Sequence, residues 1–357
     1  MKALILTDNH WGIKRSSKVF ENHILRLHKK ALDYCKENDI KIIFHLGDFF
    51  DVRKDVSYIT LDTVKKEFLD PAKEMGIQFY MVAGNHDCPN RNNIESNAVS
   101  IVFKEYENIR VFNFPSLLEL EDGSSCVFCP WIAKDDEKDF LKRIDKLSSK
   151  ADIILGHFEF KGFLYQKGIV AEHGMEAQTF TPKFQTIISG HYHSKSSKDG
   201  VHYLGTQYDL TWADYDEKKY FHVLDTKTGD LEAIENPDRM YHKLFYNEHR
   251  IDNGVIEELK TSTEFTSKII KVVVEERTNM VKFDMFMDAL YSLNPHDVTI
   301  VDERMAQQAS EATVDVTTLS TDTLSTINKY IDEAGLSGYS TATLNKIMSE
   351  LYQEAQV

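Results

Sequence analysis

Short apolar runs alternate with longer amphipathic stretches through the first hundred residues. The runs at 2–8, 40–47 and 77–84 are rich in aliphatic side chains and each ends in a loop-forming sequence, as buried strands do. Between them, apolar residues recur at helical spacing over 19–37 and 59–75. This alternation predicts parallel strands with the helices packed outside the sheet.

From residue 109 onward the pattern is that of strands. Strand-like segments occur at 109–114, 125–131, 151–157, 186–193 and 202–208. A hairpin follows at 219–235, where Thr228-Gly229-Asp230 supplies the turn. We therefore predict an α/β fold over residues 1–237, built as a sandwich of two sheets.

The remainder of the chain divides into three parts. Strands and helices alternate over 238–305, which predicts a small α+β capping module. Residues 306–323 are rich in Ser, Thr, Ala and Asp, so we interpret them as a linker. Apolar stripes in 324–357 predict a terminal helical hairpin. Such short helices need a surface to pack on, either the protein's own small module or a partner.

The composition is that of a globular protein. The 357 residues are 42% hydrophobic and 28% charged, which excludes wholesale disorder. No apolar run approaches the roughly 20 residues of a membrane span, and we expect no secretory signal. Four cysteines do not make a disulfide framework, so we interpret Cys126 and Cys129 as buried thiols. We expect a reducing, cytoplasmic location.

Polar motifs stand where five of the predicted strands end. They are Asp8-Asn9-His10, Gly47-Asp48-Phe49-Phe50-Asp51, Gly84-Asn85-His86-Asp87, Gly156-His157 and Gly190-His191-Tyr192-His193. Open α/β sheets collect ligand sites at the carboxyl ends of their strands, so these five loops can converge. We expect each glycine to permit a sharp turn that directs the next side chain into the shared crevice.

The residue types in these motifs suit a pair of metal ions. The donors are Asp8, His10, Asp48, Asn85, His157, His191 and His193. Three oxygen donors and four imidazoles are too many for one tetrahedral ion, and they match two ions of higher coordination number that share a carboxylate. Any one motif alone could be an ordinary turn. Their repetition after five strands favours the metal site.

These motifs resemble those of the calcineurin-like metallophosphoesterases. Within that family the chain is most similar to the nuclease subunit of the SbcCD-type double-strand-break repair complex, and especially to the recombination endonuclease subunits of T-even-type bacteriophages. The segments that carry this likeness are 47–54, 156–163, 189–194 and 203–206. The motifs cover residues 1 to about 237. For a phage-encoded protein the expected location is the host cytoplasm.

The resemblance implies a role for each motif residue. The first metal ion would be bound by Asp8, His10, Asp48 and His193. The second would be bound by Asp48, Asn85, His157 and His191, with Asp48 as the bridge. His86 matches the family's catalytic histidine. Asp51 stands where cellular nucleases of this branch often carry histidine; its carboxylate either orients His86 or only caps a turn.

Basic residues follow the same loops. They are Lys14, Arg15, Arg53, Lys54, Arg91, Lys195 and Lys198. A nucleic-acid backbone passing over the metals would meet them, although charges on loops are commonly only solvated. The chain as a whole has a net charge of −15, concentrated after residue 283, so DNA binding would need such a local patch or metal ions.

The implied function is a DNA nuclease that needs two divalent ions, manganese first and magnesium as the alternative. Its implied partner is an SbcC-like coiled-coil ABC ATPase, and a homodimer would form through the segments 57–75 and 94–107. Two alternatives remain open on the sequence. One is a phosphoesterase of small phosphodiesters, cyclic nucleotides or phosphoproteins, and the other is a non-catalytic scaffold for the ATPase.

Overall fold

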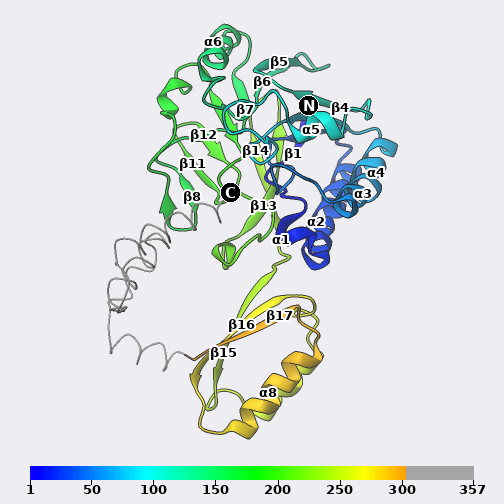
Figure 1. Cartoon of the computed structure of the whole chain (residues 1–357), viewed down its shortest axis with the longest axis vertical. Coiled ribbons are helices and arrows are strands. Elements are labelled where there is room, and N and C mark those ends of the chain that lie inside the picture. Colours follow the sequence, from blue (N-terminus) through cyan, green and yellow to red (C-terminus); the bar gives the residue numbers. More distant parts are fainter. Residues whose placement is uncertain (303–357) are drawn as a thin grey trace, which may run out of the picture.

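The computed structural model describes residues 1–302, whose body consists of two facing six-stranded sheets (Figure 1). The first sheet has the order β14 (Leu231–Asn236), β13 (Lys219–Asp225), β1 (Lys2–Leu6), β2 (Ile42–His45), β3 (Gln78–Val82) and β4 (Ile109–Phe112). The second has the order β11 (Ser196–Lys198), β12 (Val201–Tyr203), β10 (Thr186–Ser189), β7 (Ile153–Gly156), β6 (Ser125–Cys129) and β5 (Ser116–Glu119). The predicted two-sheet α/β sandwich is confirmed.

Alternating side chains divide the body into an inner and an outer apolar layer. In the inner layer Ile5 and Phe44 of the first sheet belong to the same cluster as Leu155 of the second. Cys126 and Cys129 of β6 are buried free thiols, as predicted. Strands β1 to β4 run parallel, and so do β6, β7, β10 and β12. Their carboxyl ends therefore lie together at one edge of each sheet.

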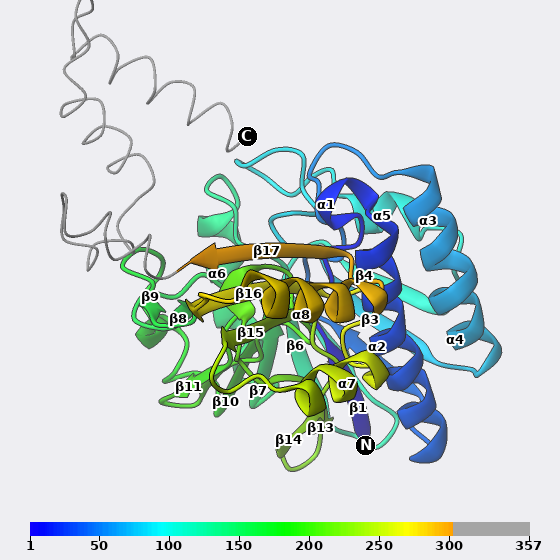
Figure 2. The same ribbon diagram turned by 90° about the horizontal axis from the view of Figure 1, so that it is seen from below.

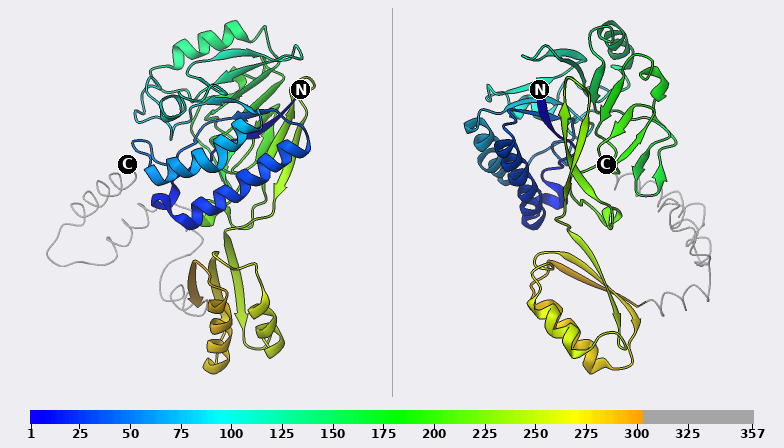
Figure 3. Two further views of the ribbon diagram at one scale, coloured as in Figure 1. Left: turned by 90° about the vertical axis from the view of Figure 1, so that its right-hand side faces the viewer. Right: turned by 180° about the vertical axis from the view of Figure 1, so that it is seen from behind.

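Helices cover the outer face of the first sheet (Figures 2 and 3). The helix α2 (Lys18–Glu37) was predicted in full. The second predicted helix is interrupted, because α3 (Tyr58–Val64) and α4 (Asp70–Glu74) flank the π-helical turn η1 (Lys65–Leu69). Pro71 lies two residues after that turn and has no backbone N–H to donate, so the wider turn accommodates it.

Several short elements were not predicted from the apolar pattern. They are the strands β5 and β11, the helices α1 (Ile13–Ser16), α5 (Ala98–Val102) and α6 (Glu137–Leu147), the β8 (Leu164–Gln166) and β9 (Ile169–Val170) hairpin, and the 3₁₀ turns η2 (Ala177–Thr179) and η3 (Trp212–Asp214). Helix α6 does carry an apolar stripe, since Leu141 and Leu147 pack on the core beside the buried Phe140 and Ile144, so a sequence signal for this helix existed.

A smaller unit follows the body and lies below it in Figure 1. Its order is β15 (Tyr241–Asn247), α7 (Asn253–Thr261), β16 (Ile269–Glu276), α8 (Met280–Ser292) and β17 (Asp297–Asp302). The three strands are parallel, and the unit has its own core around Tyr246, Val272 and Phe286. The linker and the helical hairpin predicted for 306–323 and 324–357 lie outside the described residues.

Candidate metal centre

The predicted polar motifs meet at one edge of the sandwich. The loops after β1, β2 and β3 come from the first sheet, and those after β7 and β10 come from the second. Donor atoms of Asp8, His10 and His193 lie within 4.8 Å of one another. Donor atoms of Asp48, His157 and His191 form a second such group. Residues separated by almost two hundred positions are thus brought together.

Several of these residues have strained backbones. Asp8 and His10 have a φ of 48°, Asp48 has 51° and His191 has 82°. Residues with a side chain rarely adopt this left-handed region, and where they do it is commonly at a functional site. The chain turns sharply within a few residues of each strand end, and these angles are what bring the donors to a common point.

The motif glycines serve mainly to provide space. A Cβ at Gly84 would lie 2.2 Å from Asp48 Oδ1, and one at Gly190 would lie 2.0 Å from Thr7 Oγ1. Of the motif glycines only Gly47 has a positive φ, 95°. The expectation that each glycine supplies a sharp turn is therefore right for Gly47 alone, because the others allow neighbouring loops to approach.

Asp48 lies between the two donor groups. Its Oδ2 is 3.8 Å from His10 Nε2 and 3.4 Å from His157 Nε2. Its Oδ1 accepts a hydrogen bond of 2.7 Å from the backbone N–H of His86. Burial opposes ionisation, yet the neighbouring His157 holds the pKa of Asp48 well below its usual range. The carboxylate is thus placed to contact cations on both sides.

Hydrogen bonds orient the donors of the second group. His157 Nδ1 lies 2.7 Å from the carbonyl of Leu46, to which it donates, so Nε2 faces the centre. There, Nε2 lies 3.0 Å from Asn85 Oδ1 and 3.2 Å from His191 Nδ1. His191 Nδ1 is also 2.9 Å from Asn85 Oδ1. Three donors from three loops therefore point at one position.

The first group is equally buried. Asp8 accepts hydrogen bonds from the Thr7 hydroxyl at 2.5 Å and the His191 backbone N–H at 3.0 Å, and burial raises its pKa to about 6. Neither ring nitrogen of His10 has an aligned hydrogen-bond partner. Burial alone would lower the pKa of His10, but Asp51, 3.2 Å away, and Asp48 raise it to about 9. Buried carboxylates facing imidazoles are a donor set that fits divalent cations.

His86 lies at the rim of the centre. Its Nδ1 is 2.6 Å from the main-chain carbonyl of Asp51, while the Asp51 carboxylate faces His10. Of the two roles left open for Asp51, the carboxylate is not seen to contact His86, and the contact with His86 is made by the Asp51 backbone carbonyl. The His86 and His10 rings are 4.8 Å apart, and burial lowers the pKa of His86.

The predicted basic residues are placed unevenly. Lys14 and Arg15 are exposed just beyond His10. The Arg53 guanidinium lies 5.9 Å from the Trp131 ring, Lys54 and Arg91 are exposed, and the Lys195 ammonium lies 4.5 Å from the Tyr220 ring. Lys198 pairs with Val201 at the amino end of β12, away from the edge that bears the histidines. Lys198 is thus not brought to the centre.

Two supporting groups were missed from the sequence. Asp87 accepts hydrogen bonds from Phe49, Phe50 and Gly84, which ties the loop after β2 to the loop after β3. It ends the Gly84–Asp87 motif, so a signal for it existed. Lys219 has no such signal. Its buried ammonium donates to the carbonyl of His193 at 3.1 Å and to Asp214 at 2.6 Å.

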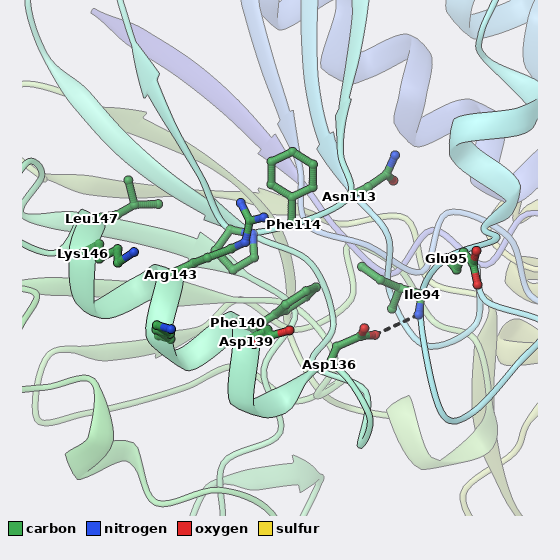
Figure 4. Close-up of a pocket in the computed structure, with 12 residues that line it drawn as sticks. Ile94, Glu95, Asn113, Phe114, Asp136, Asp139, Phe140, Arg143, Lys146 and Leu147 are labelled. Carbon is green, nitrogen blue, oxygen red and sulfur yellow. Dashed lines mark hydrogen bonds between the residues drawn. The ribbon is translucent and has the colours of Figure 1, made fainter.

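Two cavities flank this part of the molecule. One of about 760 Å³ lies between α6 and the loops at 94–95 and 113–115, where the Arg143 guanidinium is 4.6 Å from the Phe114 ring (Figure 4). None of the seven predicted ligands lines it. The other, of about 480 Å³, has His191 and His193 in its wall and so opens onto the metal centre.

Residues 1–195 match the family model of the calcineurin-like phosphoesterases, and the chain therefore belongs to that family. The resemblance read from the motifs is confirmed. The family uses divalent metal ions, in keeping with the donor groups described above. Within residues 1–302, no helix is both long and apolar enough to cross a membrane.

Among characterised proteins, the chain is similar to exonuclease subunit 1 of Enterobacteria phage T4, with 29% identity over 324 residues and 90% of each chain covered. It is also similar to the DNA double-strand break repair protein Mre11 of Sulfolobus acidocaldarius, with 23% identity over 83% of this chain and 80% of that protein. The Mre11 protein of Methanocaldococcus jannaschii is 25% identical over 66% of this chain and 65% of that protein.

Proposed function

We propose that the chain is a DNA nuclease that hydrolyses phosphodiester bonds at a centre of two divalent metal ions. The observation that carries this proposal is the position of the Asp48 carboxylate between His10 and His157. One ion would be held by Asp8, His10, Asp48 and His193, and the other by Asp48, Asn85, His157 and His191. The names of the relatives, an exonuclease subunit and double-strand break repair proteins, support DNA as the substrate.

When bound, the ions would draw charge from the phosphate oxygens and lower the pKa of a water. The protein's own side chains position the substrate and transfer protons. The Nδ1–H of His86 is held by the carbonyl of Asp51, so Nε2 is the ring atom available to the substrate. When it is protonated on both nitrogens, the His86 ring would stabilise the transferring phosphoryl group through its Nε2–H or pass that proton to the leaving oxygen. The Asp51 carboxylate faces His10 and would orient this ligand of the first metal ion.

The negative net charge of the chain favours metal ions as a point of contact with the DNA backbone. The chain carries a net charge of −15, so DNA binding needs a local source of positive potential. The ions, with the exposed Lys14, Arg15, Lys54 and Arg91 beyond the loops, would supply the positive potential that a phosphate backbone needs. Manganese is the ion we favour, with magnesium as the alternative, because the donor set mixes imidazoles with carboxylates.

We propose that the nuclease works as a subunit with an SbcC-like coiled-coil ABC ATPase and as a homodimer. Its relative in phage T4 is named as a subunit, which supports a complex. Tyr58, Ile59 and Ile101 are exposed apolar side chains on α3 and α5, in the segments expected to dimerise. Burying them between two copies is the simplest account of their exposure.

The test is cleavage of single- and double-stranded DNA by the purified chain with Mn²⁺ or Mg²⁺, beside a small phosphodiester such as bis(p-nitrophenyl) phosphate. We expect DNA cleavage that needs the metal and stops with a chelator. Rapid hydrolysis of the small phosphodiester without DNA cleavage, with either metal, would instead favour a small-molecule phosphoesterase. An inactive chain that still binds the ATPase would favour a scaffold.

A further inference from the structure

The cavity of about 480 Å³ beside the metal centre is lined in part by residues that lie outside the five sequence motifs. One side is formed by His191 and His193, and another by the β8–β9 hairpin. The hairpin is hydrogen-bonded to the loop that carries His191 and His193, because the backbone N–H of His193 donates to the carbonyl of Tyr165 at 3.0 Å. A group bound in the cavity would therefore lie directly beside the proposed metal ions.

The accessible aromatic surface in this cavity belongs to Tyr165. Its side chain is 40% exposed and lies 6.4 Å from the ring of Tyr192. Tyr192 is itself fixed, because it stacks on Tyr203 with ring centroids 4.4 Å apart and donates to the carbonyl of Phe160. The wall behind Tyr165 is thus rigid, and the Tyr165 ring has a face free for a planar ligand.

The cavity is lined by carboxylates and by three histidines, His173 among them, and its carboxylates suit a group rich in N–H donors. Glu159 and Glu172 line it, and no lysine or arginine stands among its described lining residues. The third carboxylate, that of Asp214, is paired with Lys219. The amino groups of nucleobases can donate to the free carboxylates of Glu159 and Glu172.

Building on the proposed nuclease function, we propose that this cavity receives one nucleoside adjoining the scissile phosphate, with its base stacked on Tyr165. The volume lies within the range of sites for small ligands. Stacking tolerates any base, as a nuclease without sequence preference requires. Because a base must leave its duplex to enter a pocket, the cavity favours unpaired or fraying nucleotides at the point of cleavage.

The experiment pairs a protein change with a substrate change. Wild type, Tyr165→Ala and Tyr165→Phe are assayed with Mn²⁺ on a single-stranded oligonucleotide that has one hydrolysable phosphodiester. The same oligonucleotide is made without the base on the 5′ side, or on the 3′ side, of that bond. Tyr291→Ala, which removes a tyrosine 53% exposed on α8, is the matched control. Bound manganese is measured for every variant.

We expect Tyr165→Ala to lower kcat/KM on the complete oligonucleotide roughly 5- to 160-fold, since base stacking on an aromatic ring contributes about 1–3 kcal/mol. Of the two abasic oligonucleotides, the one that lacks the stacked base should be cleaved by wild type with a kcat/KM lower by a similar factor. For Tyr165→Ala, the loss of that base should not lower kcat/KM further. Tyr165→Phe keeps the stacking face and should behave as wild type. Tyr291→Ala should leave every rate unchanged, and all variants should bind manganese equally.

An equal loss for Tyr165→Ala on complete and abasic oligonucleotides would overturn the stacking role, because Tyr165 would then act without the base. Unchanged cleavage by Tyr165→Ala would overturn it as well, and in both cases the nuclease function would stand. A wild-type protein that binds manganese but cleaves none of these oligonucleotides would instead remove the proposed function, and the nucleoside site with it.

Discussion

His86 touches the centre through two backbone contacts, one from its own N–H to Asp48 and one from its ring to the carbonyl of Asp51. Neither contact makes its side chain a ligand. We therefore expect His86→Ala to retain bound manganese and DNA affinity while turnover falls by about two to four orders of magnitude, the range for a positioned acid or charge-stabilising donor. Elemental analysis, binding of a non-hydrolysable oligonucleotide with Mn²⁺ present and single-turnover cleavage measure the three quantities.

Donor atoms of His86, His10 and Asp48 also lie within 4.8 Å of one another. Loss of manganese from His86→Ala would therefore identify His86 as a ligand and contradict the assigned role. His296→Ala is a suitable control, because this exposed histidine lies in the small unit and in none of the donor groups of the described residues.

Lys219 stabilises the loop that carries His193. Its ammonium is buried and pairs with Asp214 and Glu217 while donating to the His193 carbonyl. Removing one member of a buried ion pair leaves the other charge without compensation, so Lys219→Met should lower the free energy of unfolding by about 3 kcal/mol. Urea denaturation measures this change.

The double variant Lys219→Met with Asp214→Asn provides the control for that prediction. Because it removes both charges, it should be more stable than Lys219→Met alone. Strictly additive losses would show that the pairing is not the cause.

Single residues were predictable where the sequence repeats a pattern and not where the fold alone creates a contact. Asp8, His10 and Asp48 follow strands in recognisable motifs, so they were found. The buried contact of Lys219 with His193 joins residues 26 positions apart across a loop, and nothing in either neighbourhood marks it. The orientation of Asp51 also depended on the fold, because only the turned backbone decides whether its carbonyl or its carboxylate meets His86.

At the scale of elements, the strands that position the centre were predicted because their apolar runs are buried on both faces. The elements that shape its surroundings were not. Strands β8 and β9 contain three and two residues, too few for a period, yet they form the wall that carries Tyr165. The π-helical turn was not predicted, because its apolar residues recur at nearly the same spacing as in an α-helix.

Asp238 joins the helix α2 to the start of β16, since it pairs with Arg26 at 2.7 Å and also with Lys268. Burial opposes ionisation, yet His23, Arg26 and Lys268 hold the pKa of Asp238 well below its usual range. A carboxylate with a lowered folded-state pKa stabilises the fold above its unfolded pKa of about 3.9, and the contribution disappears as pH falls toward the folded value.

Asp238→Asn should therefore lower the free energy of unfolding by roughly 1–2 kcal/mol at pH 7, as expected for charged hydrogen bonds that are partly exposed. The difference from wild type should shrink as the pH falls below about 4. Urea denaturation from pH 7 to 3 measures both. A difference that stays constant across this range would show that the charge of Asp238 is not responsible.

At the scale of the whole molecule, the body carries the metal centre and the smaller unit has its own core. We propose that the remaining residues serve the partner, because the sequence predicts apolar stripes at 324–357 after a polar linker. Deleting residues 318–357 should leave a folded, metal-dependent nuclease that no longer binds the ATPase. Co-purification, thermal unfolding and cleavage assays measure the three outcomes.

Retention of the ATPase at full affinity by the shortened chain would contradict this role. Unfolding of the shortened chain would instead show that the segment packs on the protein itself. The matched control is a full-length chain in which Leu324, Ile327 and Ile331 are replaced by serine, since this removes one stripe without shortening the chain.

We propose that one centre holds two divalent ions through a shared Asp48. The most direct measurement is the number of Mn²⁺ ions bound per chain, by equilibrium dialysis and elemental analysis, in wild type and in Asp48→Ala. The control is Asp62→Ala, which removes an exposed carboxylate of α3 that pairs with Lys66. We predict two ions in wild type and in the control, and the loss of both at the same free manganese concentration in Asp48→Ala. Two tightly bound ions in Asp48→Ala would contradict the account.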